Sequence, residues 1–274
     1  MSNSLHTAEQ GQSEASTLTN RSPLKFFLLV FAISILFWLV GSLTPLQILP
    51  GLPVSALMII VPVAAASILI YRESKWAGVV ALLKRSFDYK QIRAKIWYIP
   101  IFLLMPGVMA ASYGVIRWMG MPVPPPQFSL LTALVMFIAF FFAGLCEELG
   151  WLGYAFDPME QRSNALRAGI ILGLIGSTWH VVPLLQADRS PAWIAWWYLY
   201  SVSLRILTIW IYNNTGKSIF AAALTHSMIN LSWQLFPINS SYFDPQITGL
   251  ILAVVVIVVT VIWGPQRLSR SKAL

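Results

Sequence analysis

Residues 128–156 have the sequence FSLLTALVMFIAFFFAGLCEELGWLGYAF, and this stretch decides the class of fold. It is longer than the ~20 apolar residues that a helix needs to cross the hydrocarbon core of a bilayer. Its only charged residues are Glu147 and Glu148, which are adjacent. A soluble helix of this length would carry a polar face. The stretch therefore predicts a membrane-spanning helix that contains a pair of carboxylates.

The composition extends this prediction to the whole chain. Hydrophobic residues make up 57% of the 274 residues and charged residues only 10%, and the mean hydropathy is +0.71. A soluble domain has about 25% charged residues, so a soluble protein is excluded. The hydrophobic runs lie at roughly 24–43, 54–71, 97–116, 128–156, 165–187, 192–212, 217–236 and 246–263. We predict an all-α, polytopic membrane helix bundle of about eight transmembrane helices.

The polar segments divide the chain into a membrane domain and its tails. Residues 1–22 are rich in Ser and Thr and lack an apolar core, so they predict a disordered cytoplasmic tail rather than a signal peptide. Residues 23–265 form the predicted transmembrane helical domain, and residues 266–274 form a short basic cytoplasmic tail.

The distribution of basic residues predicts the orientation. Seven of the 18 Lys and Arg residues lie in the segment from Arg72 to Lys95, whereas Thr44–Pro53 carries no charge. By the positive-inside rule, the basic segment and both termini are cytoplasmic, and the protein is a multi-pass protein of the cytoplasmic membrane. Apolar residues among the cations of 72–95 predict either an amphipathic helix on the lipid surface or a solvated loop.

The remaining composition excludes several classes of function. The net charge is +8, but the basic residues lie in connections between apolar runs, with no base-recognition motif, so we expect membrane lipids and no nucleic acid as partners. The single cysteine, Cys146, excludes an intrachain disulfide framework and any paired-cysteine metal or redox site.

The informative residues are the polar ones inside the apolar runs, because each is costly in a membrane unless it is paired. They are Glu147, Glu148, His180, Arg205, His226 and Asn230. Counting at ~1.5 Å per residue from the predicted cytoplasmic ends puts Glu147 and His226 about 14–15 Å deep, and His180 about 20 Å deep. His226 and Asn230 are four residues apart and share one helix face. The depths predict that three helices bring these groups together.

A carboxylate and two histidines in an apolar site indicate hydrolysis of an acyl bond. A glutamate beside a histidine can deprotonate a water, while a second histidine and an amide donate hydrogen bonds to the oxyanion. Glu147, His180 and His226 could instead bind zinc, with a water in the open position. Two other interpretations stay open: a polar network that holds the helices together, and a relay for protons or substrate.

Three segments resemble, in order, the motifs of the CPBP family, which comprises type II CAAX prenyl endopeptidases and bacteriocin-processing proteins and is also called the Abi family. The segments are Glu147-Glu148-Leu149-Gly150-Trp151-Leu152-Gly153-Tyr154, Trp179-His180 followed by Pro183, and Thr225-His226-Ser227-Met228-Ile229-Asn230. The resemblance covers about residues 128–235. It implies an all-helical intramembrane endopeptidase with about eight spans.

The resemblance also implies roles for the site residues. Glu147 would activate a water together with His180, His226 and Asn230 would form the oxyanion hole, and Glu148 would support the site. The favoured family mechanism needs no metal, and the alternative is zinc held by Glu147, His180 and His226. The substrate would be a peptide or protein near the bilayer, lipidated or not. The rival function is a non-catalytic immunity or scaffold protein that binds a membrane peptide through the same cavity.

Two positions depart from the family pattern. The family motif EExxxR has an arginine where this chain has Leu152, and an aromatic residue often stands where it has Gly176. Gly169, Gly173 and Gly176 instead predict close helix packing. An unpaired Arg205 within a span would cost about 3 kcal/mol, so we predict that it pairs with the two glutamates and replaces the missing charge. The alternative is that Arg205 binds backbone carbonyls or extends along Tyr198 and Tyr200 to the outer surface.

Overall fold

The computed structural model describes residues 21–49, 51–127, 129–236 and 243–270. The predicted tails, 1–22 and 266–274, lie in part outside these residues. The principal elements are α2 (Pro23–Leu43), β1 (Gln47–Leu49), β2 (Leu52–Pro53), η1 (Val54–Ile60), α3 (Val61–Lys84), α4 (Tyr98–Trp118), α5 (Leu130–Gly150), a π-helical segment η5 (Trp151–Phe156), α6 (Asp157–Arg162), α7 (Ala165–Gln186), α8 (Pro191–Asn214), α9 (Ile219–Leu235) and α10 (Pro245–Trp263). The predicted all-helical class is confirmed, and β1 and β2 add only a small antiparallel hairpin.

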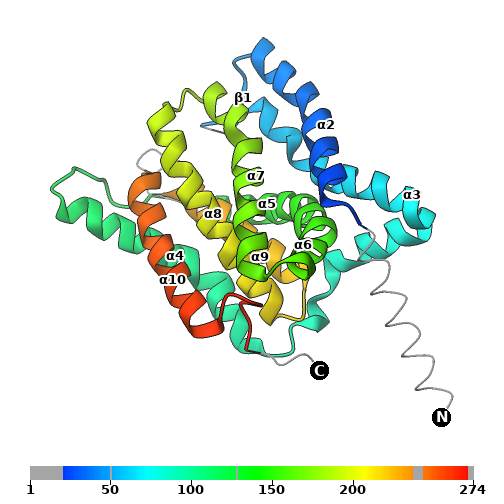
Figure 1. Ribbon diagram of the computed structural model, residues 1–274. Coiled ribbons are helices and arrows are strands. Elements are labelled where there is room, and N and C mark those ends of the chain that lie inside the picture. The colour runs from blue at the N-terminus through cyan, green and yellow to red at the C-terminus, as the bar shows by residue number, and fades with distance from the viewer. Residues whose placement is uncertain (1–20, 50, 128, 237–242, 271–274) are drawn as a thin grey trace.

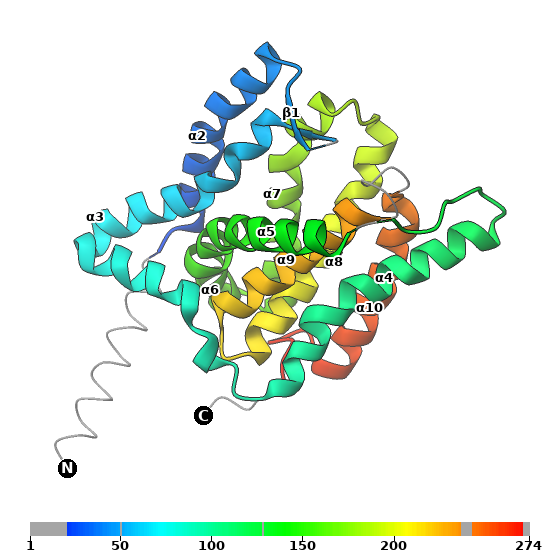
Figure 2. The same ribbon diagram turned by 180° about the vertical axis from the view of Figure 1, so that it is seen from behind.

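The helices form a bundle around α5 and α9 (Figures 1 and 2). The most extensive pairings are α8 with both α7 and α10, and α5 with α9. Figure 2 shows α5 crossing the bundle while α7 stands upright. The depth predicted for Glu147, which was counted along the helix, stays a prediction.

Among the residues that the structure describes, seven helices are long and apolar enough to cross a membrane, which makes the chain a multi-pass membrane protein. The run at 217–236 forms α9, which is outside this set because it has only 17 residues. At 1.5 Å per residue, α9 is ~26 Å long, slightly less than the ~30 Å hydrocarbon core. It is therefore an eighth helix of the bundle, packed against α5, α4 and α8, rather than an eighth full span.

Polar residues in the connections set where the helices begin. The side chains of Ser22, Ser129, Asn164, Ser190, Ser218 and Asp244 accept hydrogen bonds from backbone N–H groups in the first turns of α2, α5, α7, α8, α9 and α10. These residues satisfy donors that the helix itself leaves unpaired, which matters most where water is scarce. The caps on α5, α7, α8 and α9 fix the helices that carry the site residues.

The basic segment 72–95 is helical in its first half. α3 has a non-helical residue at Lys75 (φ 55°, ψ −156°) and then continues to Lys84. After this kink Val79 and Leu82 are buried, whereas Trp76 and Leu83 are exposed. Residues 76–84 are therefore helical, with Val79 and Leu82 packed on the protein, and the predicted contact of this helix with the lipid surface stays a prediction.

Candidate active site

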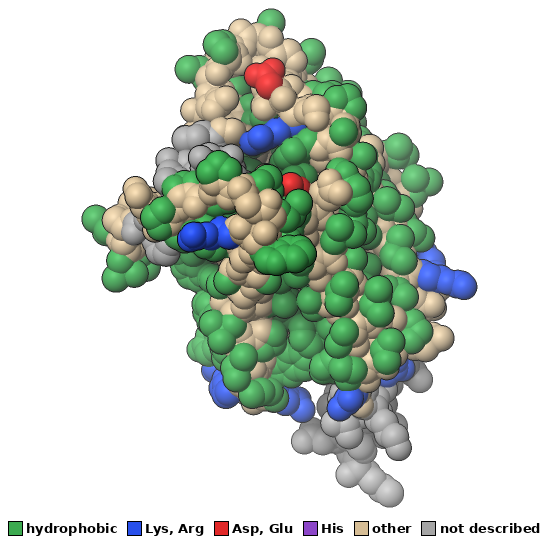
Figure 3. Space-filling view, turned by 90° about the vertical axis from the view of Figure 1, so that its left-hand side faces the viewer, with side chains coloured by type: hydrophobic (Ala, Val, Ile, Leu, Met, Phe, Trp, Pro, Cys, Tyr) green, Lys and Arg blue, Asp and Glu red, His purple; other side chains and the backbone are tan. Residues whose placement is uncertain are grey.

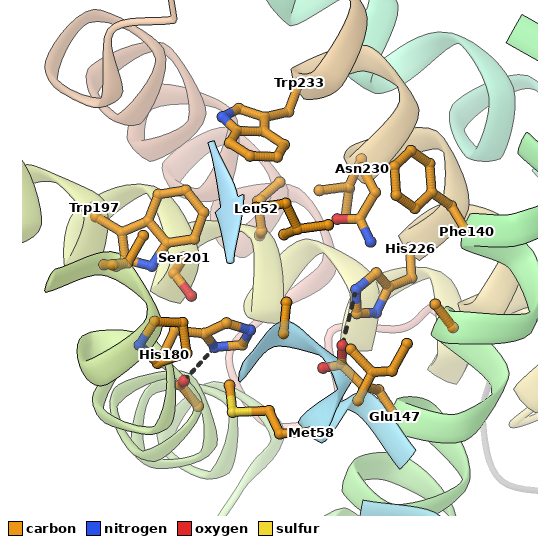
Figure 4. Close-up of a pocket in the computed structure, with 18 of the residues that line it drawn as sticks. Leu52, Met58, Phe140, Glu147, His180, Trp197, Ser201, His226, Asn230 and Trp233 are labelled. Carbon is orange, nitrogen blue, oxygen red and sulfur yellow. Dashed lines mark hydrogen bonds and ion pairs between the residues drawn. The ribbon is translucent and has the colours of Figure 1, made fainter. Parts of the chain in front are cut away.

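A cavity of about 320 Å³ lies inside the bundle between the hairpin and helices α5, α7, α8 and α9 (Figure 4). Its lining includes every polar residue that the sequence singles out: Glu147, Glu148, His180, Arg205, His226 and Asn230. The rest of the lining is mainly apolar or aromatic. The structure therefore brings together residues from four helices that are as much as 83 positions apart in the chain, from 147 to 230.

Glycines allow α5 to approach its neighbours closely where it carries the glutamates. A Cβ on Gly150 would lie 2.6 Å from the carbonyl oxygen of Pro62, and one on Gly144 would lie 3.1 Å from the carbonyl oxygen of Ala223. Any larger residue would push α5 away from α3 or α9. The segment after Gly150 becomes π-helical, a local change that is rare and frequent at functional sites.

The position of α9 is fixed by an acidic residue from the basic loop. The carboxylate of Asp88 accepts hydrogen bonds from the Ser218 hydroxyl at 2.7 Å and from the backbone N–H groups of Ile219 and Phe220 at 3.1 and 3.0 Å. A carboxylate at a helix N-terminus also favours the helix dipole. Asp88 therefore fixes the helix that presents His226 and Asn230 to the cavity.

A chain of charged contacts runs from α8 through α5 to α9. Arg205 donates from Nη1 to Glu148 Oε2 at 2.7 Å, and the other Glu148 oxygen accepts from His226 Nδ1 at 2.8 Å. The Glu148 side chain is only 1% exposed, so the pairing offsets the cost of burying a carboxylate. The predicted contact between Arg205 and the glutamate pair is confirmed, and the alternative paths for Arg205 are not taken.

Glu147 has a different environment from Glu148. Its Oε2 accepts a hydrogen bond from Trp151 Nε1 at 3.3 Å, and its Oε1 lies 3.8 Å from His226 Nε2 (Figure 4). The second distance is longer than a hydrogen bond. Unlike Glu148, Glu147 has no arginine partner among the described residues, and it faces the cavity with room for a further donor.

His180 lies on the wall of the cavity opposite Glu147 (Figure 4). Its Nδ1 is 2.7 Å from the carbonyl oxygen of Gly176. A carbonyl can only accept, so Nδ1 carries the proton, and in a neutral imidazole Nε2 is then an acceptor. Trp179 packs edge-on against the ring and is itself held by a 2.7 Å hydrogen bond from its indole to Ser34. The free nitrogen of His180 is thus held toward the cavity.

Asn230 lies one turn beyond His226 on α9, and its amide points into the cavity (Figure 4). It makes no side-chain hydrogen bond to another residue of the described ranges. An amide in this position has two N–H donors available for a bound group. The predicted shared face of His226 and Asn230 is therefore present in the structure.

The residues proposed as zinc ligands do not form a metal site in this arrangement. Within the described part of the chain, no group of three or more His, Cys, Asp or Glu side chains is placed to hold a metal ion. Glu147, His180 and His226 share a cavity without converging on one point, so the geometry does not fit a zinc centre.

The two departures from the family pattern have clear structural positions. Leu152 is fully buried in the hydrophobic core and is not part of the cavity lining. A Cβ on Gly173 would lie 2.9 Å from Val202 Cα, and one on Gly169 would lie 3.1 Å from Ile209 Cδ1, so both glycines pack against α8 as predicted. The packing prediction for Gly176 is wrong, because no atom would lie within 4 Å of its Cβ. Gly176 instead widens the cavity and supplies the acceptor for His180.

The sequence analysis did not predict several lining residues. Trp151 follows Glu147 by one helical turn, and that spacing could have identified its indole as a donor to the carboxylate. The hairpin residues from Ile48 to Pro53 carry no charge or motif that would mark them as part of a site. Ser201, whose hydroxyl points into the cavity in Figure 4, likewise has no distinguishing sequence pattern.

Comparisons with known proteins agree with the sequence motifs. Residues 129–232 match the family described as Rce1-like, type II CAAX prenyl endopeptidase Rce1-like. CAAX prenyl protease 2 from Methanococcus maripaludis is 30% identical over 243 residues, which cover 80% of this chain and 86% of that protein. The Asp, Glu, Lys and Arg residues that line the cavity are Glu147, Glu148, Arg189 and Arg205, and all four lie within the matched range.

Proposed function

Because the chain belongs to the family of Rce1-like type II CAAX prenyl endopeptidases, we propose that it is an intramembrane endopeptidase that hydrolyses a peptide bond near the bilayer. The convergence of Glu147, His180, His226 and Asn230 on one cavity carries this proposal. We place the protein in the cytoplasmic membrane, with both termini on the cytoplasmic side. The substrate is a peptide or protein, lipidated or not.

Glu147 is the general base in this mechanism. It accepts a proton from a water molecule as the water oxygen attacks the carbonyl carbon of the scissile bond. The acceptor nitrogen of His180, on the facing wall, orients that water by receiving its second hydrogen. Among the described residues Glu147 is the carboxylate suited to this role, because Arg205 and His226 already occupy both oxygens of Glu148.

His226 and Asn230 stabilise the oxyanion that forms on the carbonyl oxygen. Asn230 donates from its amide, and His226 donates from Nε2 in its doubly protonated form, while Glu148 holds Nδ1–H. Donors fixed in an apolar cavity are effective because they need no reorganisation when the charge develops. Arg205 and Glu148 are thus positioning residues that keep His226 in place.

The reaction ends when the carbon–nitrogen bond breaks. Glu147, now a carboxylic acid, returns the proton to the leaving amine, so the products are a new amine and a new carboxylic acid, which then loses its proton to water. This path uses no metal. The rival path, with zinc bound by Glu147, His180 and His226, would require these side chains to move together from their positions in the structure.

Cleavage of a tagged peptide library in detergent tests the proposal. Alanine at Glu147, His180 or His226 should lower turnover by at least ~100-fold, the scale of a lost general base or oxyanion donor. Activity that survives a chelator, in protein without stoichiometric zinc, would support the metal-independent path. Equal cleavage by the wild type and Glu147→Ala would contradict the mechanism. Binding of a peptide without cleavage by the wild type would favour the scaffold function.

A further inference from the structure

Basic side chains are concentrated at one end of the bundle. Apart from Arg72 and Lys75 within α3 and from Arg117, Arg189 and Arg205, the described Lys and Arg residues lie near the starts of α2, α4, α7 and α9 or near and beyond the ends of α3, α6, α8 and α10. Figure 3 shows several of them along the lower end of the molecule, below a broad hydrophobic surface. Positive charge of this kind marks the cytoplasmic side. The opposite end, with the hairpin and the α7–α8 connection, is then extracytoplasmic.

The catalytic cavity extends toward that opposite end. Above the site residues it is lined by the hairpin, by residues 56–59 of η1, by Leu184 near the end of α7, by Arg189, and by Trp233 near the end of α9. All of these belong to the predicted extracytoplasmic end. At the edge of the cavity, Ile48 is 45% and Leu57 46% exposed, so the lining reaches the protein surface there.

The cytoplasmic end of the site is closed by densely packed side chains. Every residue of 151–156, 206–212 and 221–225 is buried. These three segments belong to η5, α8 and α9 and continue toward the basic end from the residues that carry the site, and two of their residues, Trp151 and Thr208, line the cavity itself. A peptide cannot pass through packing of this density without unfolding it.

At the basic edge of this packed layer a hydrogen-bonded cluster joins the end of α3, helix α6, the end of α8 and the α8–α9 connection. Arg85 donates to Tyr212 Oη at 2.8 Å, and Lys217 Nζ contacts Asp157 at 2.8 Å and Glu160 at 2.9 Å. Burial alone would lower the pKa of Lys217, but the nearby carboxylates of Asp157 and Glu160 raise it above its usual value. These hydrogen bonds and ion pairs connect the segments at the cytoplasmic end and keep that end closed.

We propose that substrates reach the catalytic cavity from the extracytoplasmic half of the bilayer. This inference rests on the proposed function and names its substrate class: an apolar peptide segment of an exported or membrane-anchored chain, presented at the outer leaflet rather than in the cytoplasm. The exposed apolar edge at Ile48 and Leu57 and the indoles of Trp197 and Trp233 suit such a segment, because amphipathic aromatic rings favour the membrane interface.

Accessibility of single cysteines in intact cells tests this proposal. The chain has one cysteine, so Cys146→Ala provides a background for Ser201→Cys in the cavity. Gln47→Cys in the hairpin and Arg93→Cys in the basic loop are matched controls, since both positions are exposed and lie at opposite ends. A charged, membrane-impermeant maleimide should label Ser201→Cys and Gln47→Cys in intact cells. Arg93→Cys should lose its labelling unless the cells are permeabilised.

Two results would overturn the proposal. The first is that the maleimide labels Ser201→Cys only in inverted vesicles, or in neither preparation, although it labels Gln47→Cys from outside. The second is that Arg93→Cys is labelled in intact cells and Gln47→Cys only after permeabilisation. A protein that cleaves no peptide but shows the expected labelling would leave the access route standing and contradict only the proposed activity. Conversely, a bulky maleimide added from outside should reduce peptide cleavage by Ser201→Cys and leave the Cys146→Ala background unaffected.

Discussion

Arg205 carries the charge that the family motif places at the position of Leu152. In the structure the guanidinium reaches Glu148 from another helix, at 2.7 Å, while Leu152 packs in the apolar core. Glu148 thus receives its positively charged partner from α8 and not from the first motif. The catalytic interpretation therefore does not depend on an arginine within the first motif.

A double-mutant cycle measures the contribution of this ion pair. Arg205→Met should destabilise the protein by about 3–5 kcal/mol, because it leaves Glu148 buried without a compensating charge. Glu148→Gln combined with Arg205→Met should cost less than Arg205→Met alone, since no unpaired charge remains. Thermal unfolding in detergent, followed by tryptophan fluorescence, gives the comparison. Equal stability of Arg205→Met and the wild type would show that the pair is not needed.

Asn230 contributes one neutral donor to the proposed oxyanion hole. Asn230→Ala should lower kcat by roughly 10–100-fold with little change in KM, a smaller loss than His226→Ala, whose donor is charged. Ser227→Ala is a matched control on α9, because Ser227 bonds to the Phe137 carbonyl and does not line the cavity. A control that loses as much kcat as Asn230→Ala would assign the loss to distortion of α9.

At the scale of elements, the contact between α5 and α3 depends on Gly150. Gly150→Ala would put a methyl group 2.6 Å from the Pro62 carbonyl oxygen, where only a backbone shift can relieve the overlap. We expect loss of stability and of activity together, because Glu147 and Glu148 move with the end of α5. Gly114→Ala in α4 is the control, since nothing lies within 4 Å of its Cβ. It should be neutral or slightly stabilising, by up to ~1 kcal/mol. Equal unfolding temperatures for the two variants would contradict the packing argument.

How far the sequence predicts this structure differs between the elements and the site. Apolar runs identify each long helix, because the bilayer requires ~20 apolar residues per span. They do not reveal that α5 crosses the bundle, nor that residues 151–156 become π-helical, since packing decides both. A buried arginine in an apolar span requires a nearby negative charge, and this requirement predicts the pairing of Arg205 with the glutamates. The bond from His226 to Glu148 was not predictable in the same way, because it depends on the relative rotation of α5 and α9.

At the scale of the whole molecule, the predicted orientation can be checked directly. Reporter fusions at Gln47 and Arg93 should place the hairpin outside and the basic loop inside, because the positive-inside rule assigns the loop to the cytoplasm. Arg93 suits a fusion because its side chain is exposed. Fusions that report the same side would contradict the topology and the access route.

The catalytic claim as a whole depends on Glu147. The most direct test compares kcat for peptide cleavage by purified wild type and Glu147→Gln, after thermal unfolding has shown that both are equally folded. Glutamine keeps the shape of the side chain and an oxygen for the Trp151 indole but cannot accept a proton from water. We predict a loss of kcat of at least ~100-fold for Glu147→Gln, with the unfolding temperature unchanged. A folded Glu147→Gln protein that cleaves the peptide at the wild-type rate would contradict the account.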